Sequence, residues 1–422
     1  MPEQAKPCLC LITFGCKANQ YDSACLLGYL KDDFVLVAPD SETPADIYIL
    51  NTCTVTHKAD FEARQWLRRV KRLNPQAQVI ITGCLGEANP GGLREEKPEQ
   101  IFGIKDRAEL VKYLLSRDIA LSGEIFFHPQ AGKQMRARAL LKIQEGCNYR
   151  CSYCIVPYAR GKSRSLEKDQ IFSQLVALQE QGFKEVVLCG INLGEWGKDL
   201  GSDLAELLKA IKDGGFDFRI RLSSLEPMTI TEPLLEVFKE ADFLCPHLHL
   251  ALQSGDDEIL SRMKRPYKAK DFLALSQKLF DIIPNLCLGL DVIVGFPGEE
   301  EKHFRNTLEL LEQIPFAYLH IFSFSPRPFT PGGKLRPRVP ERIIQEREKV
   351  LFELVELKKR AYLNQQRGKI LEMIIEDREG EWVFGHSENY LYLKTKSSAS
   401  LRSKISVKIE KIVDEEIIAR EI

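Results

Sequence analysis

The sequence lacks long hydrophobic runs and an excess of charge of either sign. No apolar run approaches the ~20 residues that a membrane span needs, and residues 1–7 are too polar for the apolar part of a secretory signal. The formal net charge is −1 at pH 7, so bulk charge gives no indication of a polyanionic partner. These absences predict a cytoplasmic protein that does not interact with membranes.

The chain is long and rich in cysteine. It has 422 residues, 44% hydrophobic and 28% charged, which is enough to bury a large core in two or three domains. Twelve cysteines in a chain without a secretory signal indicate metal or redox chemistry rather than a disulfide framework.

Three of the cysteines form a tight CxxxCxxC run, at Cys147, Cys151 and Cys154. Thiolates are soft ligands, and three on one loop can hold three corners of a [4Fe-4S] cluster while the fourth iron stays open for chemistry. The alternative is a zinc knuckle. Zinc sites usually have paired Cys-x2-Cys ligands and a fourth ligand, and no close histidine follows Cys154.

Three further cysteines recur at one position of a repeated pattern. Strand-like apolar runs at residues 9–15, 47–52 and 79–83 each end immediately before a cysteine, namely Cys16, Cys53 and Cys84. Helical patterns lie at residues 23–30 and 60–73, and this alternation predicts a parallel α/β sheet. Because ligands collect at the carboxyl ends of such strands, the three thiols form a candidate second cluster site, again with one open iron.

The alternative for these three cysteines is ordinary burial, since free cysteine is among the most buried residue types. The other six cysteines lack the regular placement and are predicted to be core residues: Cys8, Cys10, Cys25, Cys189, Cys245 and Cys287.

A longer β/α series follows from about residue 140. The six predicted strands are residues 140–144, 185–189, 219–223, 247–252, 287–294 and 316–322. Six units predict an incomplete (β/α) barrel, because a full barrel has eight. The CxxxCxxC run follows the first strand, and polar and glycine residues follow several others, where such barrels place their chemistry. Taken singly, these polar residues are also typical of turns and helix caps.

The last segment changes character. A charged helix is predicted at residues 341–365, followed by short alternating strands at residues 369–376, 382–386, 390–395 and 405–413. This pattern predicts a small β-barrel of the kind that grips nucleic acid. Residues 367–422 hold ten Lys or Arg against eleven Asp or Glu, so binding would depend on a local face.

One local basic cluster lies on the predicted helix at residues 60–73. Its members are spaced to share one side of that helix: Arg64, Arg68, Arg69, Lys71 and Arg72. A nucleic-acid contact is one interpretation, and a solvated helix face is the simpler one.

Nearly the whole chain resembles the radical S-adenosylmethionine (radical SAM) methylthiotransferases. The resemblance is most specific at residues 15–23 (GCKANQYDS), 51–60 (NTCTVTHKAD), 145–161, 223–227 and 295–299. It implies an α/β protein with an amino-terminal parallel α/β domain, residues 1–128, that carries Cys16, Cys53 and Cys84. A partial (β/α)6 radical SAM barrel, residues 129–364, and a TRAM-like small β-barrel, residues 365–422, would follow.

Within this family, the amino-acid sequences of residues 17–20 and 54–60 are most similar to those of the branch that acts on N6-threonylcarbamoyladenosine at tRNA position 37. The branch for N6-isopentenyladenosine at that position is the second candidate. A branch that modifies an aspartate of a ribosomal protein is the third.

The resemblance also implies the cofactors and the reaction. The cluster of Cys16, Cys53 and Cys84 would hold a sulfide that one S-adenosylmethionine methylates. The CxxxCxxC cluster would cleave a second molecule of S-adenosylmethionine. The radical formed in this way would abstract the hydrogen from C2 of the adenine. Because that C–H bond is not acidic enough for a protein base, the task of the protein is positioning.

Further site residues and partners follow from the same resemblance. The candidates for binding S-adenosylmethionine are Tyr153, Gly190, Asn192, Ser223, Glu226, Gln253 and Arg265. Cys189 stands where the family has threonine, and a thiol there is an oxidation liability. The expected partners are a tRNA anticodon stem-loop and an electron donor such as flavodoxin or ferredoxin, with the enzyme a monomer. A function of another class, a non-catalytic RNA-binding iron–sulfur protein, would not need S-adenosylmethionine.

Overall fold

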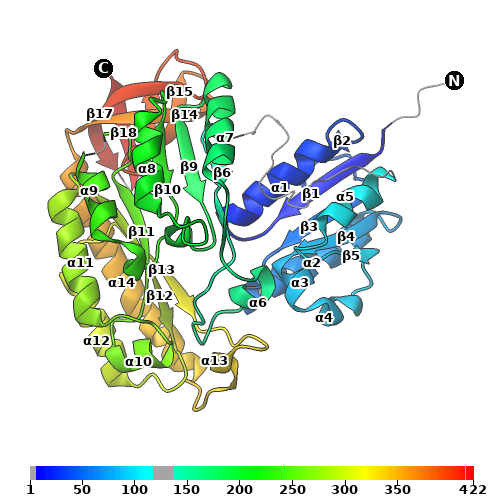
Figure 1. Ribbon diagram of the computed structural model, residues 1–422, viewed down its shortest axis with the longest axis horizontal. Coiled ribbons are helices and arrows are strands. Elements are labelled where there is room, and N and C mark those ends of the chain that lie inside the picture. Colours follow the sequence, from blue (N-terminus) through cyan, green and yellow to red (C-terminus); the bar gives the residue numbers. More distant parts are fainter. Residues whose placement is uncertain (1–5, 117–135, 241, 414) are drawn as a thin grey trace. The chain divides into compact units, whose positions relative to one another are not determined.

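The computed structural model describes residues 6–116, 136–240, 242–413 and 415–422, and the chain divides into two compact units (Figure 1). The cysteine unit lies within Met1–Gln134 and adds Glu145–Lys162 and Ser325–Gly333. The barrel unit comprises Met135–Gln144, Ser163–Phe324 and Lys334–Ile422. The predicted boundary between residues 128 and 129 falls outside the described residues, and the three-domain division stays a prediction.

The cysteine unit is built on a parallel sheet of five strands in the order β2-β1-β3-β4-β5. The strands are β1 (Cys8–Thr13), β2 (Val35–Leu36), β3 (Ile47–Thr52), β4 (Gln78–Gly83) and β5 (Gln100–Ile101). The helices are α1 (Lys17–Leu30), α2 (His57–Leu73), α3 (Cys84–Ala88), α4 (Pro90–Arg94), α5 (Arg107–Leu115) and α6 (Val156–Arg160). The predicted parallel α/β sheet is confirmed. The edge strands β2 and β5 were not predicted, because two residues are too short for a periodic pattern.

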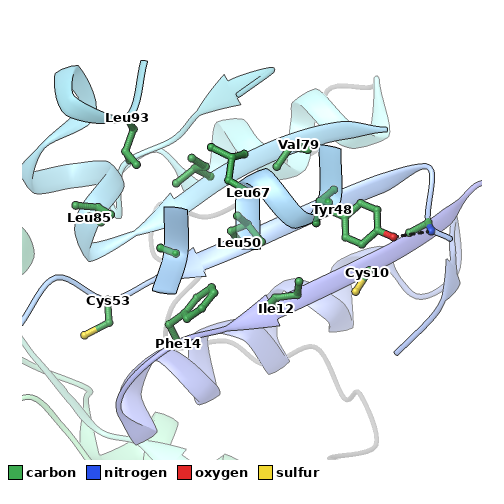
Figure 2. Packing of buried hydrophobic residues seen from close by; sticks show 14 residues of the cluster. Cys10, Ile12, Phe14, Tyr48, Leu50, Cys53, Leu67, Val79, Leu85 and Leu93 are labelled. Carbon is green, nitrogen blue, oxygen red and sulfur yellow. Dashed lines mark hydrogen bonds between the residues drawn. The ribbon is translucent and has the colours of Figure 1, made fainter. Parts of the chain in front are cut away.

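Both faces of this sheet are covered, which explains why its central strands are mainly apolar until they approach their carboxyl ends. On one face, Tyr48 and Leu50 of β3 pack with Leu67 of α2 (Figure 2). On the other face, Ile49 of β3 packs with Leu26 of α1. Because successive strand residues point to opposite faces, burial on both sides fixes the register and the edge at which the strands end.

The barrel unit begins with six parallel strands in two sheets, β10-β9-β6 and β11-β12-β13. Isolated bridges between Ile220 and Leu244 and between Leu225 and Leu250 lie where the two sheets adjoin. The strands are β6 (Ala139–Lys142), β9 (Glu185–Cys189), β10 (Arg219–Leu222), β11 (His247–Gln253), β12 (Cys287–Val294) and β13 (Tyr318–Ser323). The predicted six-unit partial barrel is confirmed.

Helices follow the strands of this half-barrel. They are α7 (Lys168–Glu180), α8 (Leu204–Asp213), α9 (Glu232–Glu240), α10 (Asp257–Arg262), α11 (Ala269–Ile282), α12 (Glu301–Gln313) and α14 (Glu341–Gln366). The short helix α13 (Pro331–Lys334) begins in the segment Ser325–Gly333 of the cysteine unit. The short elements are β7 (Gln144–Glu145), β8 (Arg164–Ser165), η1 (Leu193–Glu195) and η2 (Pro227–Thr229). No helix among the described residues is long and apolar enough to cross a bilayer.

The carboxyl-terminal strands close into a barrel in the order β14-β15-β16-β18-β17. They are β14 (Ile370–Glu379), β15 (Trp382–Ser387), β16 (Tyr392–Lys396), β17 (Lys404–Val413) and β18 (Glu416–Glu421). The predicted small β-barrel is confirmed, but the fifth strand, β18, was missed. It pairs antiparallel with β17 and parallel with β16, and this long-range closure has no local sequence signal.

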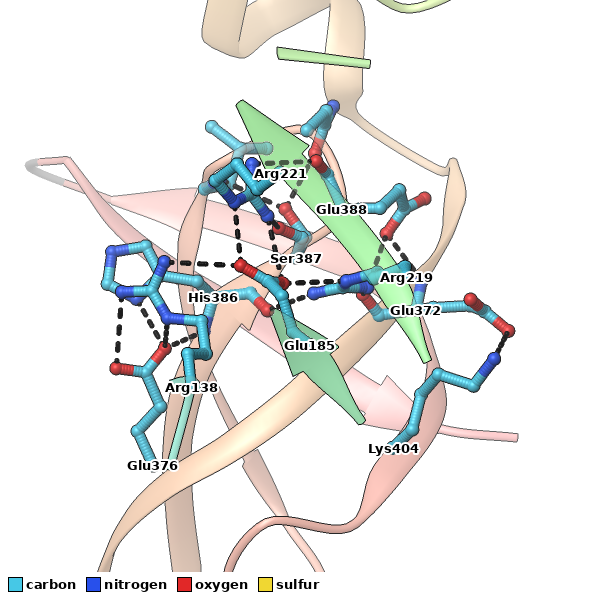
Figure 3. Close-up of polar contacts among 12 residues, drawn as sticks. Arg138, Glu185, Arg219, Arg221, Glu372, Glu376, His386, Ser387, Glu388 and Lys404 are labelled. Carbon is cyan, nitrogen blue, oxygen red and sulfur yellow. Dashed lines mark hydrogen bonds and ion pairs between the residues drawn. The ribbon is translucent and has the colours of Figure 1, made fainter. Parts of the chain in front are cut away.

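Buried arginines join the closed barrel to the half-barrel (Figure 3). Arg221 Nε and Arg219 Nε each donate to a carboxylate oxygen of Glu185 at 2.7 Å. The Nη atoms of the same two arginines donate to backbone oxygens of the closed barrel, from Arg219 to Glu372 (2.8 Å) and His386 (3.0 Å), and from Arg221 to Ser387 (2.9 Å) and Glu388 (3.0 Å). Burial raises the pKa of Glu185, but the two arginines outweigh it and hold the pKa far below its usual value.

Candidate active site

The first cysteine triplet lies at the carboxyl ends of three neighbouring strands. Cys16 caps α1 after β1, Cys53 follows β3, and Cys84 begins α3 after β4. The strand order places β3 between β1 and β4, so the three thiols gather at one edge of the sheet. Cys16 is exposed, whereas Cys53 and Cys84 are buried. The sequence-based placement of this triplet on one rim therefore agrees with the arrangement of the strands.

Glycines allow the chain to turn tightly at this edge. Gly15 and Gly83, which precede Cys16 and Cys84, have φ values of +85° and +91°. A Cβ on Gly15 would lie 2.9 Å from Cys53 Sγ, and one on Gly83 would lie 2.4 Å from the Thr52 carbonyl oxygen. Only glycine fits this close approach at positive φ, and the approach brings the three cysteine segments together.

The thiols of the triplet influence one another. Burial raises the pKa of Cys53 to about 12, and the neighbouring Cys84 and Cys16 contribute to the rise. Burial also raises the pKa of Cys84, whereas the positive charge of Arg160 opposes it. Three thiols in one partly buried group, next to a fixed cation, are a donor set that fits an iron–sulfur cluster.

Arg160 is the buried cation beside this triplet. Its Nε donates to Cys84 Sγ at 3.3 Å, Nη1 to Glu145 Oε1 at 2.7 Å, and Nη2 to Asp22 Oδ2 at 3.2 Å. Arg160 Nη2 also donates to Asn19 Oδ1. Burial lowers the pKa of Arg160, but the acidic groups around it raise the pKa well above the usual value, so the guanidinium stays charged. No sequence pattern indicated a role for Arg160, although Arg160 lies within the motif stretch of residues 145–161 that contains the CxxxCxxC run.

A polar network extends from Arg160 beneath the sheet edge. Asp22 also pairs with Arg107 Nη1 at 2.8 Å, and Arg107 Nη2 donates to Asn51 Oδ1 at 3.2 Å. Asn51 Nδ2 in turn donates to the Asn19 carbonyl oxygen at 2.9 Å. Asn19, Asp22 and Asn51 belong to the two amino-terminal motif stretches, so those stretches specify the support of the thiols as well as two of the thiols themselves.

The second triplet lies on an irregular loop of the same unit. The Cys147 N–H donates to the Gly161 carbonyl oxygen and the Cys154 N–H to the Cys151 carbonyl oxygen, both at 3.1 Å. Cys151 is buried, and Cys147 and Cys154 are half-buried. Gly146 precedes the loop with φ +72°, and a Cβ there would lie 2.0 Å from the Lys162 carbonyl oxygen. Three thiols within eight residues fit three corners of a cluster.

Helix α6 links the two triplets. It follows Cys154 in the chain, and its Ala159 packs with Cys84 of α3 and with Ile104 in one apolar cluster. The two groups of thiols thus belong to one compact unit and are connected through a short helix that ends at Arg160.

The predicted S-adenosylmethionine residues of the barrel unit lie near the carboxyl ends of its strands. Gly190 and Asn192 follow β9, Ser223 and Glu226 follow β10, and Gln253 ends β11. Ser223 Oγ is buried with no hydrogen-bond partner among the described residues, which fits a group that awaits a ligand.

Two of the candidate cofactor residues in this unit, Glu226 and Arg265, form an ion pair with each other. Arg265 Nη2 donates to Glu226 Oε2 and, at 2.9 Å, to the Ala251 carbonyl oxygen. The Asn192 N–H donates to Gln144 Oε1 at 2.8 Å, although sequence reasoning did not single out Gln144. Tyr153 lies on the cysteine loop of the other unit. The assignment of these residues to the cofactor remains a prediction.

The remaining cysteines and the basic helix have simpler roles. The five buried cysteines confirm the prediction that they are core residues: Cys10, Cys25, Cys189, Cys245 and Cys287. Cys8 is half-buried. On α2, Arg68 Nε donates to Glu96 Oε2 at 3.0 Å and Lys71 Nζ to the Glu96 carbonyl oxygen at 2.6 Å, so part of the basic cluster is neutralised within the unit.

The outer face of β15 and β16 carries a ladder of aromatic and basic side chains. The cross-strand pairs are Trp382 with Lys396, Phe384 with Lys394 and His386 with Tyr392. The Nζ atoms of Lys394 and Lys396 lie 5.1 and 5.6 Å from the centroid of the Trp382 ring. Bases stack on such rings, and lysines contact phosphates, so this aromatic ladder has the composition of a single-stranded RNA contact.

Family models match two parts of the chain. Residues 141–311 match the radical SAM superfamily, and residues 9–103 match the uncharacterized protein family UPF0004. The threonylcarbamoyladenosine tRNA methylthiotransferase MtaB of Aquifex aeolicus is 38% identical over 400 residues, covering 90% of this chain and 95% of that protein. Its Thermotoga maritima counterpart is 37% identical over 349 residues, covering 81% and 80%.

The chain belongs to the radical SAM methylthiotransferase family. Another relative, the tRNA-2-methylthio-N(6)-dimethylallyladenosine synthase of Polynucleobacter necessarius, is 33% identical over 398 residues, covering 89% of each chain. The radical SAM methyltransferase TsrM of Kitasatospora setae, with tryptophan and a SAM analog bound, has a TM-score of 0.56 at 16% identity, covering 78% of this chain and 75% of that one. This last likeness concerns the fold alone. The chain is a radical SAM tRNA methylthiotransferase, with the [4Fe-4S] cluster and S-adenosylmethionine that the family implies.

Proposed function

We propose that this methylthiotransferase installs a methylthio group on C2 of N6-threonylcarbamoyladenosine at tRNA position 37, using two [4Fe-4S] clusters and two molecules of S-adenosylmethionine. The observation that carries the proposal is the first cysteine triplet, Cys16, Cys53 and Cys84, which lies at one sheet edge next to Arg160 in addition to the CxxxCxxC loop. A radical SAM enzyme with a single cluster has no need of this group. The choice of nucleoside rests on a comparison of two groups of relatives. Those named as threonylcarbamoyladenosine enzymes are 34–38% identical to this chain, and those named as dimethylallyladenosine enzymes are 31–33% identical to it.

The protein residues have distinct tasks in this scheme. When bound, the clusters supply the one-electron cleavage of S-adenosylmethionine and an iron that carries the sulfur to be transferred. Cys147, Cys151 and Cys154 hold one cluster, and the rim triplet holds the other. Arg160 keeps a positive charge at the Cys84 thiolate and so stabilises an anionic ligand in a buried place.

The barrel-unit residues bind S-adenosylmethionine in this scheme. Ser223 and Asn192 offer polar groups to the cofactor, with Gly190 and Gln253 also at strand ends of this unit. Tyr153 of the cysteine loop is proposed as a cofactor residue from the family resemblance alone. The ion pair between Glu226 and Arg265 fixes both side chains at this edge. Their work is to orient the cofactor and to exclude water.

The closed barrel serves as a TRAM-like module that grips the anticodon stem-loop through the aromatic ladder. A loop nucleotide suits this enzyme because its base can be turned into a pocket without opening a long duplex. We also infer that the enzyme acts as a cytoplasmic monomer and takes electrons from a flavodoxin or ferredoxin.

Nucleoside analysis tests the choice of substrate. In a strain that lacks the gene, mass spectrometry of tRNA nucleosides should show the threonylcarbamoyl nucleoside without its 2-methylthio group, and the cloned gene should restore that group. Loss of the group only from the isopentenyl nucleoside would assign the enzyme to that substrate instead. An unchanged tRNA together with an altered ribosomal protein would point to the aspartate branch.

An assay of the purified protein separates catalysis from RNA binding alone. After anaerobic reconstitution, the enzyme should carry about eight irons per chain, as two [4Fe-4S] clusters require. It should form both 5′-deoxyadenosine and S-adenosylhomocysteine. A protein that binds tRNA but forms neither product would be a non-catalytic iron–sulfur protein.

A further inference from the structure

Two histidines and an aspartate converge on the barrel unit, apart from the residues assigned above. His249 lies on β11, Asp291 on β12 and His320 on β13, which are neighbouring parallel strands. Asp291 Oδ1 is 2.8 Å from His249 Nε2 and 3.1 Å from His320 Nδ1, and the three ligand atoms lie within 4.8 Å of one another. One carboxylate oxygen therefore faces a nitrogen of each imidazole.

The strand register explains why these side chains meet. Asp291 is directly opposite His320, and His249 is opposite Gly289. Gly289 has no side chain, and the ring of Tyr318 fills the space, because a Cβ on Gly289 would lie 2.1 Å from Tyr318 Cζ. The Tyr318 hydroxyl lies 3.1 Å from His249 Nδ1, so the second nitrogen of that imidazole is held by a partner outside the group.

The group of His249, Asp291 and His320 is buried on the His249 side and exposed to solvent on the His320 side. The side chain of His249 is 7% exposed and that of Asp291 19%, whereas that of His320 is 56% exposed. Burial raises the pKa of Asp291, but the hydrogen bonds to His249 and His320 outweigh it and lower the pKa to about 2, so the carboxylate is ionised at neutral pH. An ion held here would be reached from the His320 side.

We propose that His249, Asp291 and His320 bind one divalent first-row transition-metal ion, zinc being the best match for the donor set. Two imidazole nitrogens and one carboxylate oxygen are a ligand set that zinc takes when it keeps a further position open. Metal-bound histidines usually hydrogen-bond a fixed polar partner through their other ring nitrogen. His249 Nδ1 has such a partner in the Tyr318 hydroxyl, 3.1 Å away. The ion would tie three strands together, and its open position would take water or an oxygen ligand. This proposal is independent of the proposed methylthiotransfer.

Zinc content and ligand type test the proposal. The anaerobically reconstituted protein, with its cysteines occupied by iron–sulfur clusters, would be equilibrated with zinc chloride, freed of excess metal by gel filtration and analysed by mass spectrometry for zinc. X-ray absorption spectroscopy at the zinc edge identifies which elements are bound to the zinc. The wild type should retain about one zinc with nitrogen and oxygen ligands only. His320→Ala and Asp291→Asn should each lose it.

The matched control is His386→Ala, because His386 also contacts a carboxylate, with Nδ1 2.7 Å from Glu376 Oε1, yet belongs to no three-ligand group within the part of the chain that the structure describes. This variant should keep the zinc. The proposal is overturned if the wild type retains no zinc, if its zinc has sulfur ligands, or if His320→Ala and Asp291→Asn both still hold it. His320 is half exposed and Asn is isosteric with Asp, and circular dichroism verifies that both variants fold. Zinc is measured whether or not tRNA becomes modified, so failure here is distinct from failure of the proposed function.

Discussion

At the scale of single residues, the two cysteine triplets should fail in different ways when mutated. Cys16→Ala should still cleave S-adenosylmethionine, because the CxxxCxxC loop is intact, but release no methylthiolated RNA. Cys151→Ala should lose both activities. Chromatography of 5′-deoxyadenosine and of the modified nucleoside measures the two outcomes. Equal loss of cleavage in both variants would show that the proposed division of labour is wrong.

Arg160 should matter for stability as well as for the thiols. Arg160→Ala leaves the buried carboxylates of Glu145 and Asp22 without one of their cations, so the free energy of unfolding should fall by about 3–5 kcal/mol. Arg160→Lys keeps the charge but not the set of hydrogen bonds, so its loss should be smaller. Urea unfolding of the apoprotein measures both.

The matched control for Arg160 is Arg342→Ala. Arg342 pairs with Glu346 on α14 but is 79% exposed, so the change should stay within about 0.5 kcal/mol of wild type. A loss of that small size in Arg160→Ala would contradict a structural role for the buried network.

At the scale of elements, the contact between half-barrel and closed barrel depends on Glu185. Glu185→Gln leaves the buried Arg219 and Arg221 without their carboxylate, and stability should fall by about 3–5 kcal/mol. The matched control is Glu410→Gln, which breaks an exposed pair with Arg420 and should change little.

The pH dependence of this loss has a definite sign. Since the pKa of Glu185 is lowered in the folded protein from its ordinary 4.5, its contribution is complete above that value and decreases as the pH falls below it. Urea unfolding of wild type and Glu185→Gln should show a constant difference from about pH 6 to 8 and a shrinking one below about pH 4.5. A difference that grows on acidification would contradict the assignment.

The aromatic ladder should determine RNA affinity. Trp382→Ala should weaken binding of a tRNA anticodon stem-loop by about 1–3 kcal/mol, the usual value of one stacked base. Lys396→Ala should also weaken binding of the stem-loop. It should reduce the slope of the logarithm of the binding constant against the logarithm of the salt concentration by about one. Fluorescence anisotropy measures both. Phe352→Ala, at a 56% exposed aromatic of α14, is the control, and an equal loss there would argue against a specific surface.

At the scale of the whole molecule, much of the architecture could be predicted from the chain. The strands that precede Cys16, Cys53 and Cys84 are mainly apolar because helices cover both faces of the sheet, and that pattern is visible locally. The carboxyl ends of parallel strands share an edge, so spacing alone was enough to gather the three thiols.

Other features could not be read from the sequence because they depend on distant pairing. Strand β18 closes its barrel through partners on β16 and β17, and nothing in its few residues specifies them. The role of Arg160 depends on Asp22, which is 138 positions away in the chain. The group of His249, Asp291 and His320 depends on the register of three strands, which the alternation of residue types does not fix.

Arg219 and Arg221 donate to main-chain oxygens of the closed barrel, at Glu372, His386, Ser387 and Glu388. Side chains add to this attachment, because Arg138 Nε lies 2.8 Å from Glu376 Oε1 and Arg221 lies over the ring of Tyr390. Every amino acid supplies a carbonyl, so these four main-chain hydrogen bonds tolerate substitution of the residues that accept them, provided that the backbone path is kept. The module is therefore free to diverge on its outward face and to acquire a preference for different tRNAs without detaching from the catalytic body. Exchange of whole modules between relatives should succeed for the same reason.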